Sequence, residues 1–159
     1  MRTTGGKYMK IVLDDLRGPE IAAFLEDHLR EMHAITPSES VYALDLDRLR
    51  VPEVTFWSVY DGDRLVGCGA IKRIDGTHAE IKSMRTAPER RRDGVASLLL
   101  THMLAEAKAM GIERLSLETG ATEHFEQARK LYEKFGFEAC GPFEGYGPDP
   151  HSYFMTRTI

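Results

Sequence analysis

Long apolar stretches are missing from this sequence. No run approaches the ~20 apolar residues that crossing a bilayer requires, and the first residues contain no apolar segment of the kind found in secretion signals. Cysteine is scarce as well, since Cys68 and Cys140 are the only two and they do not form a Cys-x-x-Cys motif. We therefore expect a cytoplasmic protein with reduced thiols and no membrane partner.

An excess of positive charge is also missing. The 159 residues include 21 Lys and Arg against 25 Asp and Glu, a formal net charge of −4, whereas nucleic-acid-binding domains are normally basic. The six histidines are dispersed along the chain. His28 and His33 are the two closest, and on one helix they would point ~140° apart. We therefore expect no nucleic-acid partner and no bound metal ion.

Length and composition predict a single globular domain with a substantial core, since 42% of the residues are apolar and 29% are charged. Residues 1–9 are expected to form a flexible N-terminal tail, and residues 10–159 the domain. The hydrophobic periodicity predicts an α/β fold with a mixed sheet. Gly62 between two aspartates predicts a hairpin, and Gly111 and Gly136 predict helix ends. The expected strands are 10–13, 54–60, 64–74, 79–86, 115–119, 137–140 and 153–158, and the expected helices are one that begins at Pro19, then 40–49, 95–110 and 125–135.

The segment between the fourth expected strand and the third helix is the most informative part of the chain. It carries three consecutive arginines, Arg90, Arg91 and Arg92, directly before a helix. The N-terminus of a helix already carries partial positive charge, so a cation there is unfavourable by a few tenths to ~1 kcal/mol. The arrangement becomes favourable if an anion binds, because free amides, guanidinium groups and Gly94 together form a phosphate cradle. The alternative is a solvated arginine run on an exposed loop.

Two common phosphate-binding loops are absent. The sequence contains neither G-x-x-x-x-G-K-[ST] nor G-x-G-x-x-G followed by an acidic ribose partner, which argues against a nucleotide-binding module of these types. Gly67 and Gly69 flank Cys68 inside an expected strand, where close packing is the better explanation for the glycines.

Two motifs resemble the hallmarks of the GNAT superfamily of N-acetyltransferases. Residues 91–96, RRDGVA, fit the [QR]-x-x-G-x-[GA] loop, and residues 128–137, ARKLYEKFGF, are similar to A-x-x-L-Y-x-K-x-G-F. Both occur in the order and spacing of the superfamily, and the order of expected elements matches from residue 10 to residue 159. The resemblance implies a small bacterial enzyme with a GNAT-like α/β (α+β) fold. Its central sheet would be mixed and mostly antiparallel, flanked by helices, with two splayed parallel strands at 79–86 and 115–119.

Two positions depart from the pattern of the superfamily. Asp93 stands where a basic or polar residue is usual, which puts a negative charge beside the expected pyrophosphate. Phe125 stands where many relatives have an asparagine that faces the pantetheine arm.

The resemblance implies acetyl-CoA as the co-substrate. In the superfamily, the backbone of the strand before the loop hydrogen-bonds the pantetheine arm, and the loop amides hold the pyrophosphate. The positions implied to bind the coenzyme are Met84, Arg85, Thr86, Arg91, Arg92, Asp93, Gly94, Val95, Ala96, Ser97 and Ala128.

The implied reaction is direct attack of a free amine on the thioester. A lysine-like amine with a pKa of ~10.4 needs ~4.6 kcal/mol to become neutral at pH 7, so a base is required. Glu80 is the candidate, because it lies eleven residues before Arg91, the offset at which the histone-acetylating branch carries its glutamate base. Two alternatives remain open: a water relay acts as the base, or Glu80 is a strand residue that pairs with Lys82 or is solvated.

Tyr132 is the candidate general acid, because it occupies the tyrosine position of A-x-x-L-Y-x-K-x-G-F. A phenol of pKa ~10 can donate a proton or a hydrogen bond to the departing thiolate. The alternative is a half-buried tyrosine that only packs. An acyl-cysteine intermediate is disfavoured, because both cysteines lie in expected strands without a histidine nearby in the sequence, which favours buried packing.

Acceptor residues of the superfamily come from the first two helices and the last loop, and the turn at 118–120 is also expected to face the acceptor. The implied positions are His28, Met32, Ser38, Glu39, Ser40, Tyr42, Thr119 and Tyr146. The expected partner is a small-molecule amine or amino acid, and homodimer formation is left open. The alternative from another class is a non-catalytic acyl-CoA-binding sensor, which would keep the loop but not depend on Tyr132 or Glu80.

Overall fold

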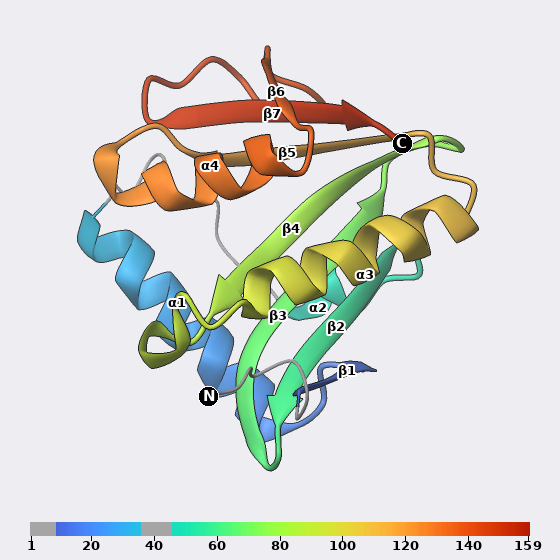
Figure 1. Ribbon diagram of the computed structural model, residues 1–159. Helices are drawn as coiled ribbons and strands as arrows, with labels where there is room; N and C mark the ends of the chain where they lie inside the picture. Colours follow the sequence, from blue (N-terminus) through green and yellow to red (C-terminus); the bar gives the residue numbers. More distant parts are fainter. Residues whose placement is uncertain (1–8, 36–45) are drawn as a thin grey trace.

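The computed structural model describes residues 9–35 and 46–159, which form a sheet flanked by helices (Figure 1). The strands are β1 (Met9–Leu13), β2 (Val54–Asp61), β3 (Arg64–Arg73), β4 (His78–Thr86), β5 (Arg114–Gly120), β6 (Glu138–Cys140) and β7 (Ser152–Thr158). The helices are α1 (Pro19–Ile35), α2 (Leu46–Leu49), α3 (Val95–Ala109) and α4 (Glu126–Lys134), with two 3-10 helices, η3 (Pro88–Arg90) and η4 (Glu123–Phe125). Within the described part of the chain, no helix is both long and apolar enough to cross a membrane.

The predicted order of strands and helices is confirmed. The helix expected over 125–135 begins as η4 and continues as α4. The helix expected over 40–49 is described from Leu46 onward as α2, and its earlier residues lie outside the described ranges. Gly62 (φ 62°), Gly111 (φ 83°) and Gly136 (φ 90°) adopt the left-handed conformation that the hairpin and the two helix ends require.

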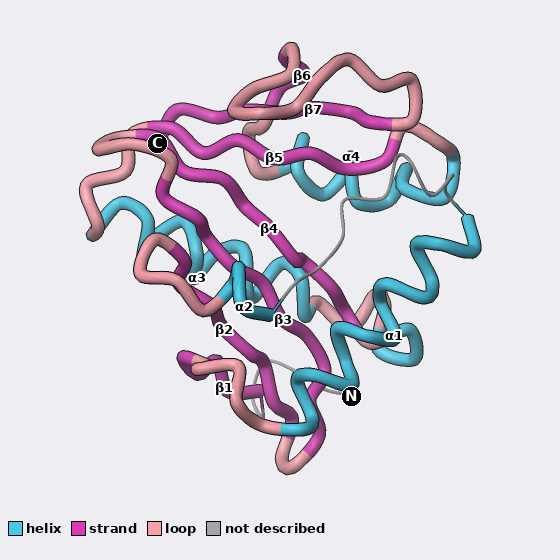
Figure 2. Tube along the Cα trace, turned by 180° about the vertical axis from the view of Figure 1, so that it is seen from behind, coloured by secondary structure: helices cyan, strands magenta, loops and turns pink. Residues whose placement is uncertain are grey.

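The seven strands form one sheet in the order β1-β2-β3-β4-β5-β7-β6. Strands β2 to β4 form an antiparallel meander, and β1 pairs antiparallel with β2. Strands β4 and β5 are parallel because α3 connects them. The last strand, β7, lies between β5 and β6 and is antiparallel to both (Figure 2). The long connection from β6 to β7 therefore brings the last strand back between β6 and β5.

The sheet is covered on both faces by apolar clusters. On one face, Leu99 of α3 and Tyr132 of α4 belong to the cluster that packs on β2 to β5. On the opposite face, Ile21 of α1 and Leu49 of α2 pack with Phe56 of β2. These opposite layers place α1 and the start of α3 on either side of the end of β4 (Figures 1 and 2).

The glycines of β3 allow α3 to approach the sheet closely. A Cβ atom on Gly67 would lie 2.6 Å from Cγ1 of Val95 on α3. One on Gly69 would lie 2.5 Å from Sδ of Met84 on β4 and 3.0 Å from Sδ of Met103 on α3. Real Cβ atoms do not make such short contacts, so close packing is confirmed as the reason for these glycines. Cys68 between them is fully buried, as its expected packing role requires.

Strands β4 and β5 separate before β4 ends. Their pairing runs from His78↔Arg114 to Ile81↔Leu117, whereas β4 continues to Thr86. The pairing of β4 with β3 also shifts register, and Ser83 at this irregularity has a φ of 57°. The two parallel strands thus splay as the resemblance implied, and the end of β4 leads directly into the loop before α3.

Candidate active site

The loop between β4 and α3 ends in an uncapped helix N-terminus. Gly94, the N-cap of α3, has a φ of 83°, and Arg92 has a φ of 76°. No described side chain caps α3, and the first N–H groups of a helix have no partner within the helix. Because the helix dipole adds partial positive charge here, these groups can donate hydrogen bonds to an anion such as a diphosphate.

The three arginines of the loop have different surroundings. Nε of Arg90 donates a 2.7 Å hydrogen bond to Oδ2 of Asp93, and its Nη2 lies 2.9 Å from Oδ2 of Asp61 at the end of β2. Arg91 reaches toward α1, while Arg92 is exposed and has no ion pair among the described residues. The negative charge of Asp93, which departs from the pattern of the superfamily, is therefore balanced by Arg90.

The backbone at the end of β4 is free on one side. Thr86 pairs with Gly67 of β3, and the side chain of Met84 packs toward α3. On the β5 side, no described strand pairs with residues 82–86. Backbone groups on that side can therefore hydrogen-bond an extended ligand. Met84 and Thr86 are the two positions for which the resemblance implied this role.

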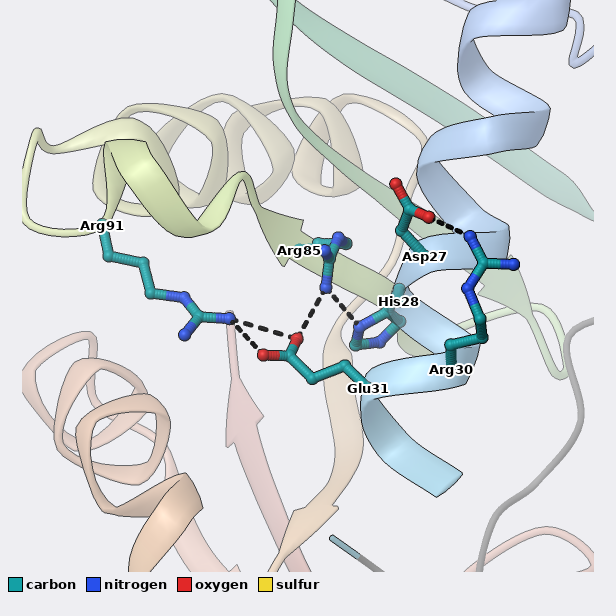
Figure 3. A network of polar contacts seen from close by, with 6 residues as sticks. All are labelled: Asp27, His28, Arg30, Glu31, Arg85 and Arg91. Carbon is teal, nitrogen blue, oxygen red and sulfur yellow. Dashed lines mark hydrogen bonds and ion pairs between the residues drawn. The ribbon is translucent and has the colours of Figure 1, made fainter. Parts of the chain in front are cut away.

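The side chain of Arg85 lies in a network with α1 rather than along the loop (Figure 3). Nη1 donates to Oε1 of Glu31 over 2.8 Å and to Nδ1 of His28 over 3.0 Å. Nη2 of Arg91 lies 3.2 Å and 3.0 Å from the two carboxylate oxygens of the same Glu31. Burial, followed by the charge of Arg85, lowers the pKa of His28 to about 4, so this imidazole is neutral near pH 7.

A second polar cluster lies where β4 and β5 separate. The hydroxyl of Tyr146, in the loop before β7, donates to Oε2 of Glu80 over 2.5 Å. Nζ of Lys82 lies 3.5 Å from the same oxygen, and Glu80 is only 4% exposed. The structure thus joins the expected base to an expected acceptor residue, and it contains the Glu80–Lys82 pair that the sequence left as an alternative.

Glu118 on β5 belongs to the same cluster, although the sequence gave it no catalytic role. Burial raises the pKa of Glu118 to about 7, and the charges of Glu80 and Asp149 also raise it. Ser116 is the register partner of Glu80, so Glu118, two residues further on, faces the same side beyond the last pair. Finding it from sequence would have required the register of β4 against β5.

Tyr132 is 6% exposed, and its ring packs edge-on against Phe137 with centroids 5.7 Å apart. Burial alone raises the pKa of the Tyr132 phenol, so it stays protonated well above neutral pH. These features are compatible with a proton donor and with a packing residue.

The remaining predicted residues are distributed over the same region. His28 and Met32 lie on α1, Thr119 on β5 and Ala128 on α4, while Ser38, Glu39, Ser40 and Tyr42 lie outside the described residues. Phe125 packs against Gly120, where a Cβ atom would overlap its ring. The described residues contain no group of three or more His, Cys, Asp or Glu that is arranged to hold a metal ion.

Comparison with known proteins identifies a family and close relatives. Residues 21–137 match the acetyltransferase (GNAT) family. A protein of Bacillus subtilis (strain 168), named uncharacterized N-acetyltransferase YsnE, is 52% identical over 95% of this chain and 100% of its own length. Another from Escherichia coli (strain K12), named uncharacterized N-acetyltransferase YedL, is 48% identical over 94% of each chain.

Solved structures show the same fold at lower sequence identity. An acetyltransferase from Streptococcus agalactiae 2603 superposes with a TM-score of 0.77 at 21% identity, covering 96% of this chain and 99% of that one. A GNAT family acetyltransferase from Elizabethkingia anophelis with acetyl-CoA bound superposes with a TM-score of 0.68 at 15% identity, covering 96% and 99%.

Proposed function

The chain belongs to the GNAT family of acetyltransferases, which transfer acyl groups from acyl-CoA, and we propose that it acetylates the primary amine of a small molecule or amino acid with acetyl-CoA. The observation that carries the proposal is the end of β4, whose β5 side has no partner strand among the described residues. It leads directly into the N-terminus of α3, which no described side chain caps. The first can bond an extended amide-containing arm, and the second can bond a diphosphate.

For the coenzyme, we assign the pantetheine arm to the backbone of Met84 and Thr86 and the diphosphate to the amides from Arg92 to Ser97. Arg92 supports this assignment, because it is the loop arginine without an ion pair among the described residues. Ala128, on the first turns of α4, would line the opposite side of the arm.

Two carboxylates are candidates for the base, and their surroundings suit them to different roles. Glu80 already accepts a hydrogen bond from Tyr146 and pairs with Lys82, so its negative charge is held in place. Glu118, with a pKa of about 7, is suited to accept the proton of the ammonium group. The sequence predicted Glu80 as the base; we now assign proton transfer to Glu118 and the fixed negative charge to Glu80.

The reaction then needs no covalent enzyme intermediate. Glu118 first takes one proton from the ammonium group and releases it to solvent. The neutral amine nitrogen then forms a bond to the thioester carbon as the carbon–sulfur bond breaks, its surplus proton passes to Glu118, and the CoA thiolate leaves and is protonated. We assign Tyr132 to donate a proton or hydrogen bond to the departing thiolate. Burial raises its pKa, which keeps the phenol protonated and favours a hydrogen bond over complete proton transfer. Cys68 is unsuited to nucleophilic attack, because burial raises the pKa of its thiol.

Acetyl-CoA tests the proposal directly. At a concentration a hundredfold above its dissociation constant, it should stabilise the protein by about 2.7 kcal/mol, which is measured as a rise in Tm, while ATP and NAD should have much smaller effects. Amine-dependent release of free thiol should follow in a screen of primary amines. Stabilisation without thiol release would instead favour an acyl-CoA sensor, and no stabilisation at millimolar acetyl-CoA would overturn the coenzyme assignment.

A further inference from the structure

Arg85 is a buried cation whose hydrogen-bonding capacity is only partly used. Its side chain is 6% exposed, and Nη1 alone makes the two hydrogen bonds to Glu31 and His28 (Figure 3). Nε is buried and has no hydrogen-bond partner among the described residues. A guanidinium group carries five N–H donors in a planar fork, and a buried donor without a partner is unfavourable. The remaining edge of the fork, formed by Nε and Nη2, has the geometry to bind a carboxylate through two parallel hydrogen bonds.

The charge around Arg85 also favours an anion. Glu31 is the shared partner of Arg85 and Arg91, so two guanidinium groups face one carboxylate. His28 adds no charge at neutral pH, because burial and Arg85 keep its imidazole neutral. The ring of Phe24, whose centroid lies 5.2 Å from the guanidinium carbon, covers Arg85 without supplying a formal charge. The cluster therefore retains a net charge of about +1.

The side chain of Arg85 lies on the same face of β4 as Glu80, the face assigned to the acceptor. Ile81 and Met84 pack toward α3, one on each side of the irregularity at Ser83, so Glu80, Lys82 and Arg85 all face away from α3. Arg85 follows Lys82 by three residues, which corresponds to roughly 10 Å along a strand. An acceptor whose amine lies at the Glu80 end would thus extend toward Arg85 along one face of β4.

We propose that Arg85, held in place by Glu31 and His28, binds a carboxylate of the acceptor, so that the substrates are amines that also carry a carboxylate, such as amino acids. This inference rests on the proposed acetyltransferase function and narrows its substrate class. Arg85 acts as a specificity-determining residue, and Glu31 and His28 as positioning residues. The competing explanation is a purely structural role, in which Arg85 and Glu31 only join α1 to β4.

Matched acids and amides separate these explanations. We would measure kcat/KM for phenylalanine, β-alanine and 4-aminobutyrate, each against its carboxamide, with acetyl-CoA saturating. Since a hydrogen-bonded charged group contributes about ten- to a hundredfold in binding, at least one acid should exceed its amide by that factor. Arg85→Gln should abolish the ratio by raising KM for the acid, and Arg85→Lys, which keeps the charge and loses the fork, should restore part of it.

Arg91→Gln is the matched control, because Arg91 pairs with the same carboxylate of Glu31 but lies in the coenzyme loop. It should weaken acetyl-CoA binding for all acceptors and lower the acid-to-amide ratio much less than Arg85→Gln does. Calorimetric titration of phenylalanine and phenylalaninamide into the protein with CoA provides a second readout that does not depend on turnover. Circular dichroism of Arg85→Lys shows whether the fold is retained.

Each outcome has a distinct meaning. Turnover with equal kcat/KM for acids and amides, or a ratio that survives Arg85→Gln, would overturn the carboxylate subsite and leave the acetyltransferase function standing. If no amine is acetylated but the protein binds phenylalanine more tightly than its amide through Arg85, the subsite stands and the proposed reaction fails. Absence of both turnover and selective binding would refute both proposals.

Discussion

The hydroxyl of Tyr146 donates a 2.5 Å hydrogen bond to Oε2 of Glu80, although the two residues are 66 positions apart in the sequence. The contact fixes the loop before β7 over the point where β4 and β5 separate. Tyr146 also packs edge-on against Phe154 of β7, with ring centroids 5.4 Å apart, so its ring is anchored independently of its hydroxyl.

Tyr146→Phe should therefore remove the hydrogen bond and keep the packing. A hydrogen bond to a charged group contributes ~1.5–3 kcal/mol, so we expect Tm to fall by several degrees with the fold retained, and kcat/KM measured below that Tm to fall by about tenfold or more. Tyr153→Phe is the control, because Tyr153 lies in the same region but contacts Arg129 through its ring. Equal activity in the two variants would show that the Tyr146 hydroxyl does not support the site.

Glu118→Gln tests the proton acceptor through pH. The wild-type kcat/KM should rise with pH through an apparent pKa near 7, because only the ionised carboxylate accepts a proton. In the variant this limb should disappear and the rate at pH 7.5 should fall by ~10²-fold or more. If kcat/KM of Glu118→Gln still rises with pH through the same pKa, the rise comes from the ionisation of another group. Glu80→Gln would then be the next variant to measure.

The same carboxyl group makes a prediction for stability. Its pKa is about 7 in the folded protein against 4.5 as the ordinary value, so between these pH values the folded state binds more protons than the unfolded state. Stability should then decrease as pH rises from 4.5 to 7, and Glu118→Gln should remove up to about 3 kcal/mol of this loss. Denaturant unfolding of both proteins at pH 5 and pH 8 measures the difference; an equal pH dependence would contradict it.

Gly94 and Gly111 offer a matched pair for the coenzyme loop. They lie at the two ends of α3, both have a φ of 83°, and an added Cβ would meet no atom within 4 Å at either site. Alanine should therefore cost about 1–2 kcal/mol of stability at both positions. Only Gly94→Ala should also weaken acetyl-CoA binding, measured as a higher Kd, because the diphosphate is assigned to its side of the helix. Equal Kd values in the two variants would place the diphosphate elsewhere.

Tyr132→Phe tests the proton donor. The ring keeps its contact with Phe137, so the fold should survive. If the phenol assists only the developing thiolate, kcat and kcat/KM should fall together by ~10²–10⁴, with the Kd of acetyl-CoA nearly unchanged. Weaker coenzyme binding with normal turnover would indicate a ground-state contact. Full activity would leave Tyr132 with packing alone.

The features that sequence predicted well are local ones. The left-handed conformations of Gly62, Gly111 and Gly136, the strand order up to β4 and the loop before α3 depend on residues within a few positions of each other. Local propensity and periodicity are sufficient for such features, because the physical contacts that decide them are also close in the sequence.

The features that sequence missed depend on register and on distant contacts. The place of Glu118 beside Glu80 follows from the pairing of Glu80 with Ser116, which no local pattern encodes. The contact between Arg85 and Glu31 joins residues 54 positions apart, and the place of β7 between β5 and β6 depends on how a long loop returns. The proposed acceptor site depends on such contacts, so the sequence indicated a candidate coenzyme loop more specifically than it indicated the acceptor residues.

The ion pairs of Arg90 and Arg91 have a consequence for protein engineering. Their partners, Asp61 on β2 and Glu31 on α1, lie outside the segment that bears the family motif. A graft of that segment into another scaffold would leave both acids behind. Arg90 would keep its pair with Asp93, but Arg91 would stand at a helix N-terminus without its partner. The segment therefore cannot be transferred alone. A graft would also have to supply acidic residues in the positions of Asp61 and Glu31.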